Sequence, residues 1–252
     1  SFLYLSLVRS DRGLISISQL EELTKNHHNF KMGFLRDTNS LMAASVPIDP
    51  MNDSAEDLVE TLRKLNIPVY SNVNIRAEFL EIQRRILIPE CLIELYERRS
   101  DLESFIAQKI KAVQTSYRKS LESKRVYKFT DDRIKEFRDI LLQVPIHEKD
   151  GWSYFCEECL APQLRVVWDD VVDLCGLNFI KIRSGENHPL LTTKVSWDGV
   201  TEIMGKYGTG SADAMILNLL LSSKIELVAT GDSDIQHLSP MLSKNRKFIL
   251  SV

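Results

Sequence analysis

The sequence has few cysteines, no strong excess of either charge and no long hydrophobic run. Its four cysteines, Cys91, Cys156, Cys159 and Cys175, are too few and too irregularly spaced for the disulfide framework of a secreted protein. We therefore expect a reducing compartment, the cytoplasm. No apolar run approaches the ~20 residues of a membrane span, so no membrane association is expected.

The overall charge of the chain does not indicate a class of binding partner. With 32 basic and 35 acidic residues, the chain has a formal net charge of -3, which gives no global signal for a nucleic acid or a membrane. Any attraction for a polyanion must therefore come from a local basic patch. The length of 252 residues is enough to bury a large core, in one large domain or in a domain with a sizeable insertion.

Several common site motifs are missing. The segment GTGSAD at 208–213 does not end in the Gly-Lys-Ser/Thr of a P-loop and lacks the third glycine of a dinucleotide fingerprint. DSDIQH at 232–237 lacks the glycine of an EF-hand loop. Cys156-x-x-Cys159 has no second pair of this kind, so buried or half-buried thiols are a simpler interpretation than a zinc site.

Short apolar segments that alternate with helical patterns predict an α/β fold with a central parallel sheet flanked by helices. A leader of residues 1–30 is expected to end in a helix, which a capping box at Ser18–Glu21 opens. Ser54 is the expected cap of the next helix. A mostly helical insertion of about 86–176 is expected within a domain of 31–252. The expected strands are 31–35, 67–71, 178–182, 226–230 and 247–252.

Acidic residues stand where these predicted elements begin or end. Asp37 follows the first strand, and Asp232 follows the fourth, with Asp234 two residues further on. Glu78 lies in the helix after the second strand, and Asp213 in the first turn of an apolar helix. Each has an ordinary alternative role, as a turn residue, a helix-end charge or a solvated acid. Because ligands of parallel sheets bind outside the carboxyl ends of the strands, we expect these acids at one edge.

Carboxylates packed this closely would repel one another and raise each other's pKa. A hard divalent cation, Mg²⁺ or Mn²⁺, resolves that conflict because it takes oxygen ligands. Such a cation can also polarise a phosphoryl oxygen. The sequence therefore predicts a metal site at this edge.

The order of these residues resembles that of the PIN-domain nucleases. The matching motifs are Asp37-Thr38-Asn39, Glu78, Asp213-Ala214 and Thr230-Gly231-Asp232-Ser233-Asp234. The match covers about 31–85 and 177–252; the leader and the long helical insertion are additions to the family pattern.

This resemblance implies a Rossmann-like PIN fold and divalent-metal-dependent hydrolysis of phosphodiester bonds, usually in RNA. It implies that Mg²⁺ or Mn²⁺ is coordinated by the catalytic residues Asp37, Glu78, Asp213 and Asp232. Asp234 is implied as an auxiliary acid at the metal, and Asn39 and Thr230 as polar supports.

Apart from the acidic residues, the basic stretch 105–128 is the strongest indication of a binding partner in the sequence. Basic side chains can neutralise phosphates, and Tyr117 and Tyr127 can stack on unpaired bases. A solvated helix face is the alternative. The basic residues expected to bind nucleic acid are Lys109, Lys111, Arg118, Lys119, Lys124, Arg125 and Lys128.

Three functions follow from these features. The first is a metal-dependent endoribonuclease acting on single-stranded RNA. The second is a catalytically silent PIN-like scaffold that binds RNA or protein through the insertion. The third is a metal-dependent phosphatase or a DNA flap nuclease that shares the acidic site. The sequence leaves a homodimer open and names no protein partner.

Overall fold

The structure is a computed structural model, and it describes residues 13–26, 28–99, 102–180 and 188–251. The chain divides into two compact units. Unit 1 comprises the described residues of Ser1–Phe79 and Val171–Val252, and unit 2 comprises those of Leu80–Asp170. Among the described residues, no helix is both long enough and apolar enough to cross a membrane.

Unit 1 is built around a parallel sheet of six strands in the order β1-β8-β7-β2-β3-β6. The register aligns Phe34 of β2 with Val69 on one side and Leu227 on the other. The strands are β1 (Leu14–Ile15), β2 (Phe34–Arg36), β3 (Val69–Asn72), β6 (Leu177–Ile180), β7 (Leu227–Thr230) and β8 (Phe248–Ser251).

The strand order contains a switch point between β2 and β7. From β2 the chain moves outward through β3 to β6, and it then returns to the other side of β2 to form β7 and β8. Two neighbouring strands whose connections leave in opposite directions open a crevice at their carboxyl ends, where ligands of such sheets bind. Asp37 follows β2 and Asp232 comes two residues after Thr230, the last residue of β7, so both stand at this point.

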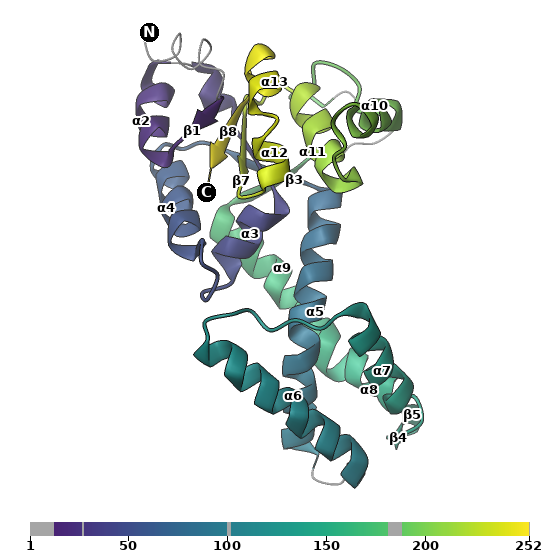
Figure 1. The fold of residues 1–252 in the computed structure, drawn as a ribbon. Coiled ribbons are helices and arrows are strands. Elements are labelled where there is room, and N and C mark those ends of the chain that lie inside the picture. Colours follow the sequence, from purple (N-terminus) through teal and green to yellow (C-terminus); the bar gives the residue numbers. More distant parts are fainter. Residues whose placement is uncertain (1–12, 27, 100–101, 181–187, 252) are drawn as a thin grey trace. The chain divides into compact units, whose positions relative to one another are not determined.

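Helices cover the sheet because its strands are apolar on both faces. Phe34, Leu227 and Phe248 share a core with residues of α2 and α4. Leu35, Val228 and Ile249 alternate with them, are equally buried, and must therefore face the opposite side. Figure 1 shows α2 and α4 together on one side, with α10 and α11 together on the other. The helices of unit 1 are α2 (Ile17–Asn26), η1 (His28–Met32), α3 (Thr38–Ser45), α4 (Asn52–Lys64), α10 (Trp197–Tyr207), α11 (Ser211–Leu221), α12 (Ser233–Gln236) and α13 (Ser239–Lys244).

Unit 2 is helical, apart from a small antiparallel pair, β4 (Pro145–Ile146) and β5 (Lys149–Asp150). Its core joins apolar residues of every helix, among them Leu92, Ile110, Phe137 and Phe155. The connections between the units run within α5 and α9. The helices are α5 (Val73–Arg98), α6 (Ser104–Glu122), α7 (Asp131–Leu141), α8 (Gly151–Phe155), the π-helix η2 (Cys156–Leu160) and α9 (Ala161–Cys175).

The α/β class and the parallel sheet are confirmed, and each predicted strand has a counterpart. A sixth strand, β1, was not predicted; it lies in the segment interpreted as a leader, and residues 1–12 of that segment lie outside the described residues. Ends of the third and fifth predicted strands, 181–182 and 252, also lie outside them. Unit 2 begins at Leu80 and ends at Asp170, whereas the insertion was expected at about 86–176.

Two predicted helix caps are wrong. The helix of the leader begins before Ser18, and it is Ser16 whose N–H donates to Gln19 Oε1, at 2.9 Å. Helix α4 begins at Asn52 after Met51, and no side-chain cap is formed there, so Ser54 lies inside the helix.

Candidate functional site

Thr230, the last residue of β7, connects two of the predicted acids. Its side chain is completely buried, so its hydroxyl needs partners within the protein. The hydroxyl donates to the carboxylate of Asp37 and accepts the N–H of Asp232, at 2.9 Å. Thr230 therefore connects the ends of β2 and β7, and its role as a polar support of a catalytic site stays a prediction.

Asp37 is the N-cap of α3 and is only 2% exposed. Its Oδ1 accepts the backbone N–H of Ser40 at 2.8 Å. Burial raises the pKa of Asp37 to about 7, although hydrogen bonds from Thr230 and Ser40 and the charge of Arg36 act to lower it, and Asp232 raises it further. The carboxyl group is therefore close to half-protonated near neutral pH, as expected where desolvation outweighs hydrogen bonding.

Asp232 is the N-cap of α12, and its two carboxylate oxygens have different partners. Oδ1 accepts the N–H of Asp234 at 2.8 Å, and Oδ2 accepts Nδ2 of Asn39 at 3.3 Å. The bond from Asn39 joins α3 to the turn after β7. Asn39 thus hydrogen-bonds the carboxylate of Asp232 directly. Asp234 lies two residues after Asp232, in the first turn of α12.

Glu78 is held by a neighbour that the sequence reasoning did not single out for a role. Thr38 Oγ1 donates to Glu78 Oε2 at 2.7 Å. Because Thr38 follows Asp37 directly, this bond joins the start of α3 to the first part of α5. The alternative acid Glu81 forms an ion pair with Arg84 and Arg85 instead, which favours Glu78 as the site residue.

Asp213 lies in the first turn of α11, as predicted, and the N-cap position is Gly210. The pKa of Asp213 is raised to about 6, first by burial and then by the charges of Asp232, Glu78 and Asp234. These electrostatic contributions require the carboxylates to be near neighbours. Asp37 is linked to the same group through Asp232.

Asp37 and Asp232 therefore lie at the switch point of the sheet with Asn39 and Thr230, and Asp213 is within electrostatic reach of Asp232, Glu78 and Asp234. Within the described ranges, however, no three His, Cys, Asp or Glu side chains are arranged as a set that could hold a metal ion. The donor chemistry fits Mg²⁺ or Mn²⁺, because every candidate ligand is a carboxylate and two of them have a raised pKa that a cation would relieve.

Arg36 is a second residue that the sequence reasoning missed. It is 1% exposed, and its guanidinium group donates to Ser40 Oγ at 2.9 Å, to the carbonyl of Ser40 at 3.0 Å and to Cys175 Sγ at 3.1 Å. Its charge also favours the ionised form of Asp37. In the sequence, its only distinguishing feature was its position at the end of an apolar segment, directly before Asp37.

The predicted nucleic-acid-binding residues lie in unit 2, along α6 and the segment after it. Lys109 pairs with Glu136, and Lys111 lies over the ring of Tyr96 at 5.7 Å. The other five are exposed, and none forms an ion pair with a described residue: Arg118, Lys119, Lys124, Arg125 and Lys128.

The two tyrosines of this stretch are less available for stacking than expected. Tyr117 donates its hydroxyl to Glu90 Oε1 at 3.0 Å, and its ring meets Tyr127 edge-on. Tyr127 in turn packs against Phe129 and the core of unit 2. Both tyrosine side chains therefore have partners within unit 2, and nucleic-acid binding by this stretch stays a prediction.

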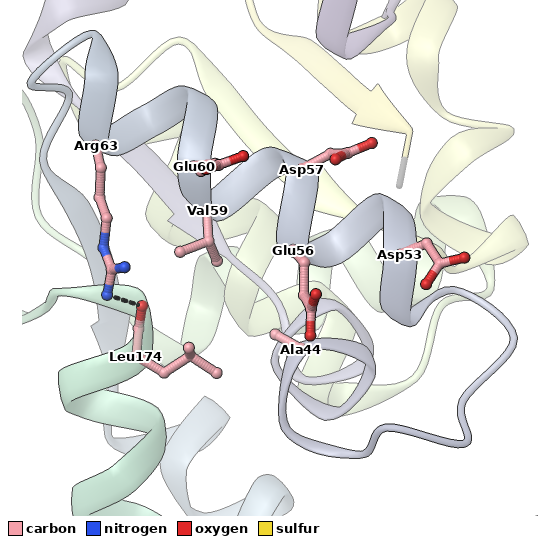
Figure 2. A pocket seen from close by; sticks show the side chains of 8 residues that line it. All are labelled: Ala44, Asp53, Glu56, Asp57, Val59, Glu60, Arg63 and Leu174. Atoms are coloured by element: carbon pink, nitrogen blue, oxygen red, sulfur yellow. Dashed lines mark hydrogen bonds between the residues drawn. The ribbon is translucent and has the colours of Figure 1, made fainter.

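A separate pocket of unit 1 contains none of the predicted site residues. Figure 2 shows four acids along α4 on its wall, with Arg63 reaching across to the carbonyl of Leu174 at 2.6 Å. No buried unpaired polar group of the structure is among its lining residues. The lining residues are Ala44, Asp53, Glu56, Asp57, Val59, Glu60, Arg63 and Leu174.

The chain was compared with protein-family models, with curated proteins and with solved structures, and no match was found. The candidate site is therefore argued from its own geometry.

Proposed function

We propose that the protein is a PIN-like, divalent-metal-dependent endoribonuclease that hydrolyses phosphodiester bonds of single-stranded RNA. The placement of Asp37 and Asp232 at the switch point between β2 and β7, with Asp213 in electrostatic reach of Asp232, Glu78 and Asp234, is the observation that supports this proposal. The agreement of these residues with the PIN pattern supports the family assignment, and the low cysteine content favours a cytoplasmic location.

The residues that would hold Mg²⁺ or Mn²⁺ are Asp37, Glu78, Asp213 and Asp232, with Asp234 as the auxiliary acid. When bound, the ion supplies Lewis acidity towards a phosphoryl oxygen and neutralises charge. Thr230 and the N–H of Ser40 hold Asp37 in place, and Asn39 and Thr38 orient the carboxylates of Asp232 and Glu78. This restricts the rotamers of the acids before any ligand arrives.

The raised pKa values also have a role in the proposed chemistry. With pKa values of about 7 for Asp37 and about 6 for Asp213, these carboxyl groups can exchange protons near neutral pH. Protons compete with a cation for these carboxylate oxygens, so protonation weakens metal binding. A bound cation would lower both values, so activity and metal binding should both increase from about pH 6 to 8.

A catalytically silent scaffold is the alternative, and one observation favours it. Glu78, Asp37 and Asp232 all have hydrogen-bond donors from the protein itself, so the cluster can be stable as a purely structural network. In that case the exposed basic residues of unit 2 would account for binding without cleavage.

The deciding experiment is cleavage of a generic single-stranded RNA in Mn²⁺ by the wild type and by the double variant Asp37→Asn, Asp232→Asn. Asparagine keeps the shape of each side chain but removes its charge, so we expect a folded protein without activity. Undiminished cleavage by the folded variant would refute the assignment. Binding without cleavage by the wild type would favour the scaffold, and a panel with DNA flaps and phosphomonoesters distinguishes the other substrates.

A further inference from the structure

The end of α10 next to the acids carries two side chains with no assigned role, Lys206 and Tyr207. Lys206 is exposed and Tyr207 is half-buried. The ammonium group of Lys206 lies over the ring of Tyr207, 5.3 Å from its centroid. Among the described residues, neither side chain has a hydrogen-bond or ion-pair partner. Both are therefore available to a ligand.

The packing of α10 on α11 fixes which end of α10 faces the acids. Asn218, in the second half of α11, donates to the carbonyl of Ser196 at 2.8 Å, and Ser196 is the N-cap of α10. A methyl group added to Gly199 would also meet Asn218, at 2.9 Å. The start of α10 thus lies against the end of α11, so the helices are antiparallel. The end of α10, with Lys206 and Tyr207, lies beside the start of α11, with Asp213.

The connection between the helices is short. Gly208 has φ of 71°, which reverses the chain after Tyr207, and Gly210 then caps α11. A methyl group on Gly210 would be 3.5 Å from Asp213 Oδ2. Because three Cα steps of ~3.8 Å separate Tyr207 from Gly210, the two Cα atoms are at most ~11 Å apart. The backbone of Tyr207 is therefore close to the start of α11, whose first turn contains Asp213.

We propose that Lys206 and Tyr207 form a nucleotide subsite beside the acids, in which Tyr207 stacks on an unpaired base of the RNA and Lys206 contacts its phosphate. This inference rests on the proposed function. An aromatic ring accepts any base on its π-face, so the subsite would bind single strands without strong sequence preference. Lys206 adds a positive charge at the end of α10, which attracts the phosphate backbone.

The binding experiment uses the full chain, a fluorescently labelled oligouridylate and EDTA, so that no cleavage occurs. Loss of a stacking ring costs ~1–3 kcal/mol per base, so Tyr207→Ala should weaken RNA binding about 5- to 150-fold. Tyr207→Phe should bind like the wild type, because the ring remains. Trp197→Ala is the matched control, since Trp197 is a 67% exposed aromatic residue at the opposite end of α10.

The role of Lys206 is tested through the salt dependence of binding. Lys206→Gln should flatten the dependence of log affinity on log salt by ~0.7 for the lost phosphate contact. Lys224→Gln, an exposed lysine just before β7, should leave the slope unchanged. In Mn²⁺, Tyr207→Ala should raise KM for RNA cleavage and leave kcat near that of the wild type, because Tyr207 is not a metal ligand.

The outcomes separate this inference from the proposed function. If the wild type cleaves RNA and Tyr207→Ala binds RNA as tightly as Trp197→Ala, the subsite is refuted and the nuclease stands. Equal losses in Tyr207→Phe and Tyr207→Ala would also refute stacking, because the hydroxyl and not the ring would then matter. A wild type that neither binds nor cleaves RNA overturns both. Unchanged thermal unfolding of Tyr207→Ala, with and without Mn²⁺, excludes misfolding as the cause of a loss.

Discussion

The burial of Asp37 makes the stability of the protein depend on pH in a way that one substitution should remove. The pKa of Asp37 rises from 3.8 to about 7 because the carboxyl group is desolvated. Its folded-state pKa therefore exceeds its unfolded value, and the native state binds more protons over this interval. The free energy of unfolding then falls as the pH rises from about 4 to 7.

The magnitude follows from the size of the shift. At 1.36 kcal/mol per pKa unit, a shift of about three units corresponds to ~4 kcal/mol. This contribution is fully present below about pH 4 and lost once the pH has passed about 7. Asp213 acts in the same direction, with a smaller effect because it is only half-buried and partly screened.

Asp37→Asn should abolish most of this dependence, because asparagine is neutral at every pH and keeps the oxygen that accepts the N–H of Ser40. The assay is urea unfolding in EDTA at several values between about pH 5 and 8. The free energy of unfolding of the variant minus that of the wild type should therefore increase as the pH rises. Asp57→Asn, an exposed acid of α4, is the control and should follow the wild type. Parallel curves for Asp37→Asn and the wild type would refute the reasoning.

Three other changes test the site and the basic stretch. Mn²⁺ at a hundredfold excess over its Kd should stabilise the wild type by ~2.7 kcal/mol in thermal unfolding. Asp213→Asn should abolish that gain, and a gain of equal size would exclude Asp213 as a ligand. Thr230→Val should cost ~1–3 kcal/mol in urea unfolding, since it leaves the part-buried N–H of Asp232 and the buried carboxyl group of Asp37 without this partner, whereas Thr230→Ser should restore most of it. Equal stability of the valine and serine variants would show that the hydroxyl contributes nothing. Replacing four exposed basic residues by glutamine should flatten the salt dependence of RNA binding by ~0.7 per lost contact, and leave Mn²⁺ binding unchanged. Unchanged affinity and slope would show a solvated helix face. The four residues are Arg118, Lys119, Lys124 and Arg125.

The positions of the acids could be predicted because each follows from a strong local pattern. The segments that became β2 and β7 are short, mostly apolar and buried; Asp37 follows β2 directly, and Asp232 comes two residues after β7. In a parallel sheet the carboxyl ends share one edge, so adjacency in space follows from position in sequence. The apolar run of α11 fixed the place of Asp213 in the same way.

The contacts that hold the acids were not predictable in this way. The partner of Arg36, Cys175, is 139 residues away in the sequence, and no local pattern joins them. Strand β1 has two residues, too few to show an alternation of apolar and polar positions. Tyr127 packs against the core of unit 2 and Tyr117 bonds to Glu90, and periodicity alone did not reveal either contact.

At Asp37 and Asp232, the structural role of a helix cap is compatible with the proposed role of a metal ligand. Asp37 and Asp232 each cap a helix, which is the ordinary role of an aspartate after a strand. The same backbone N–H donors fix the rotamer of each carboxylate and offset part of the cost of its burial. A carboxylate held in this way loses little rotamer freedom when a cation binds, so the capping geometry lowers the entropic cost of forming a metal site. Helix capping at the switch point therefore fixes these two carboxylates in position before any ligand binds.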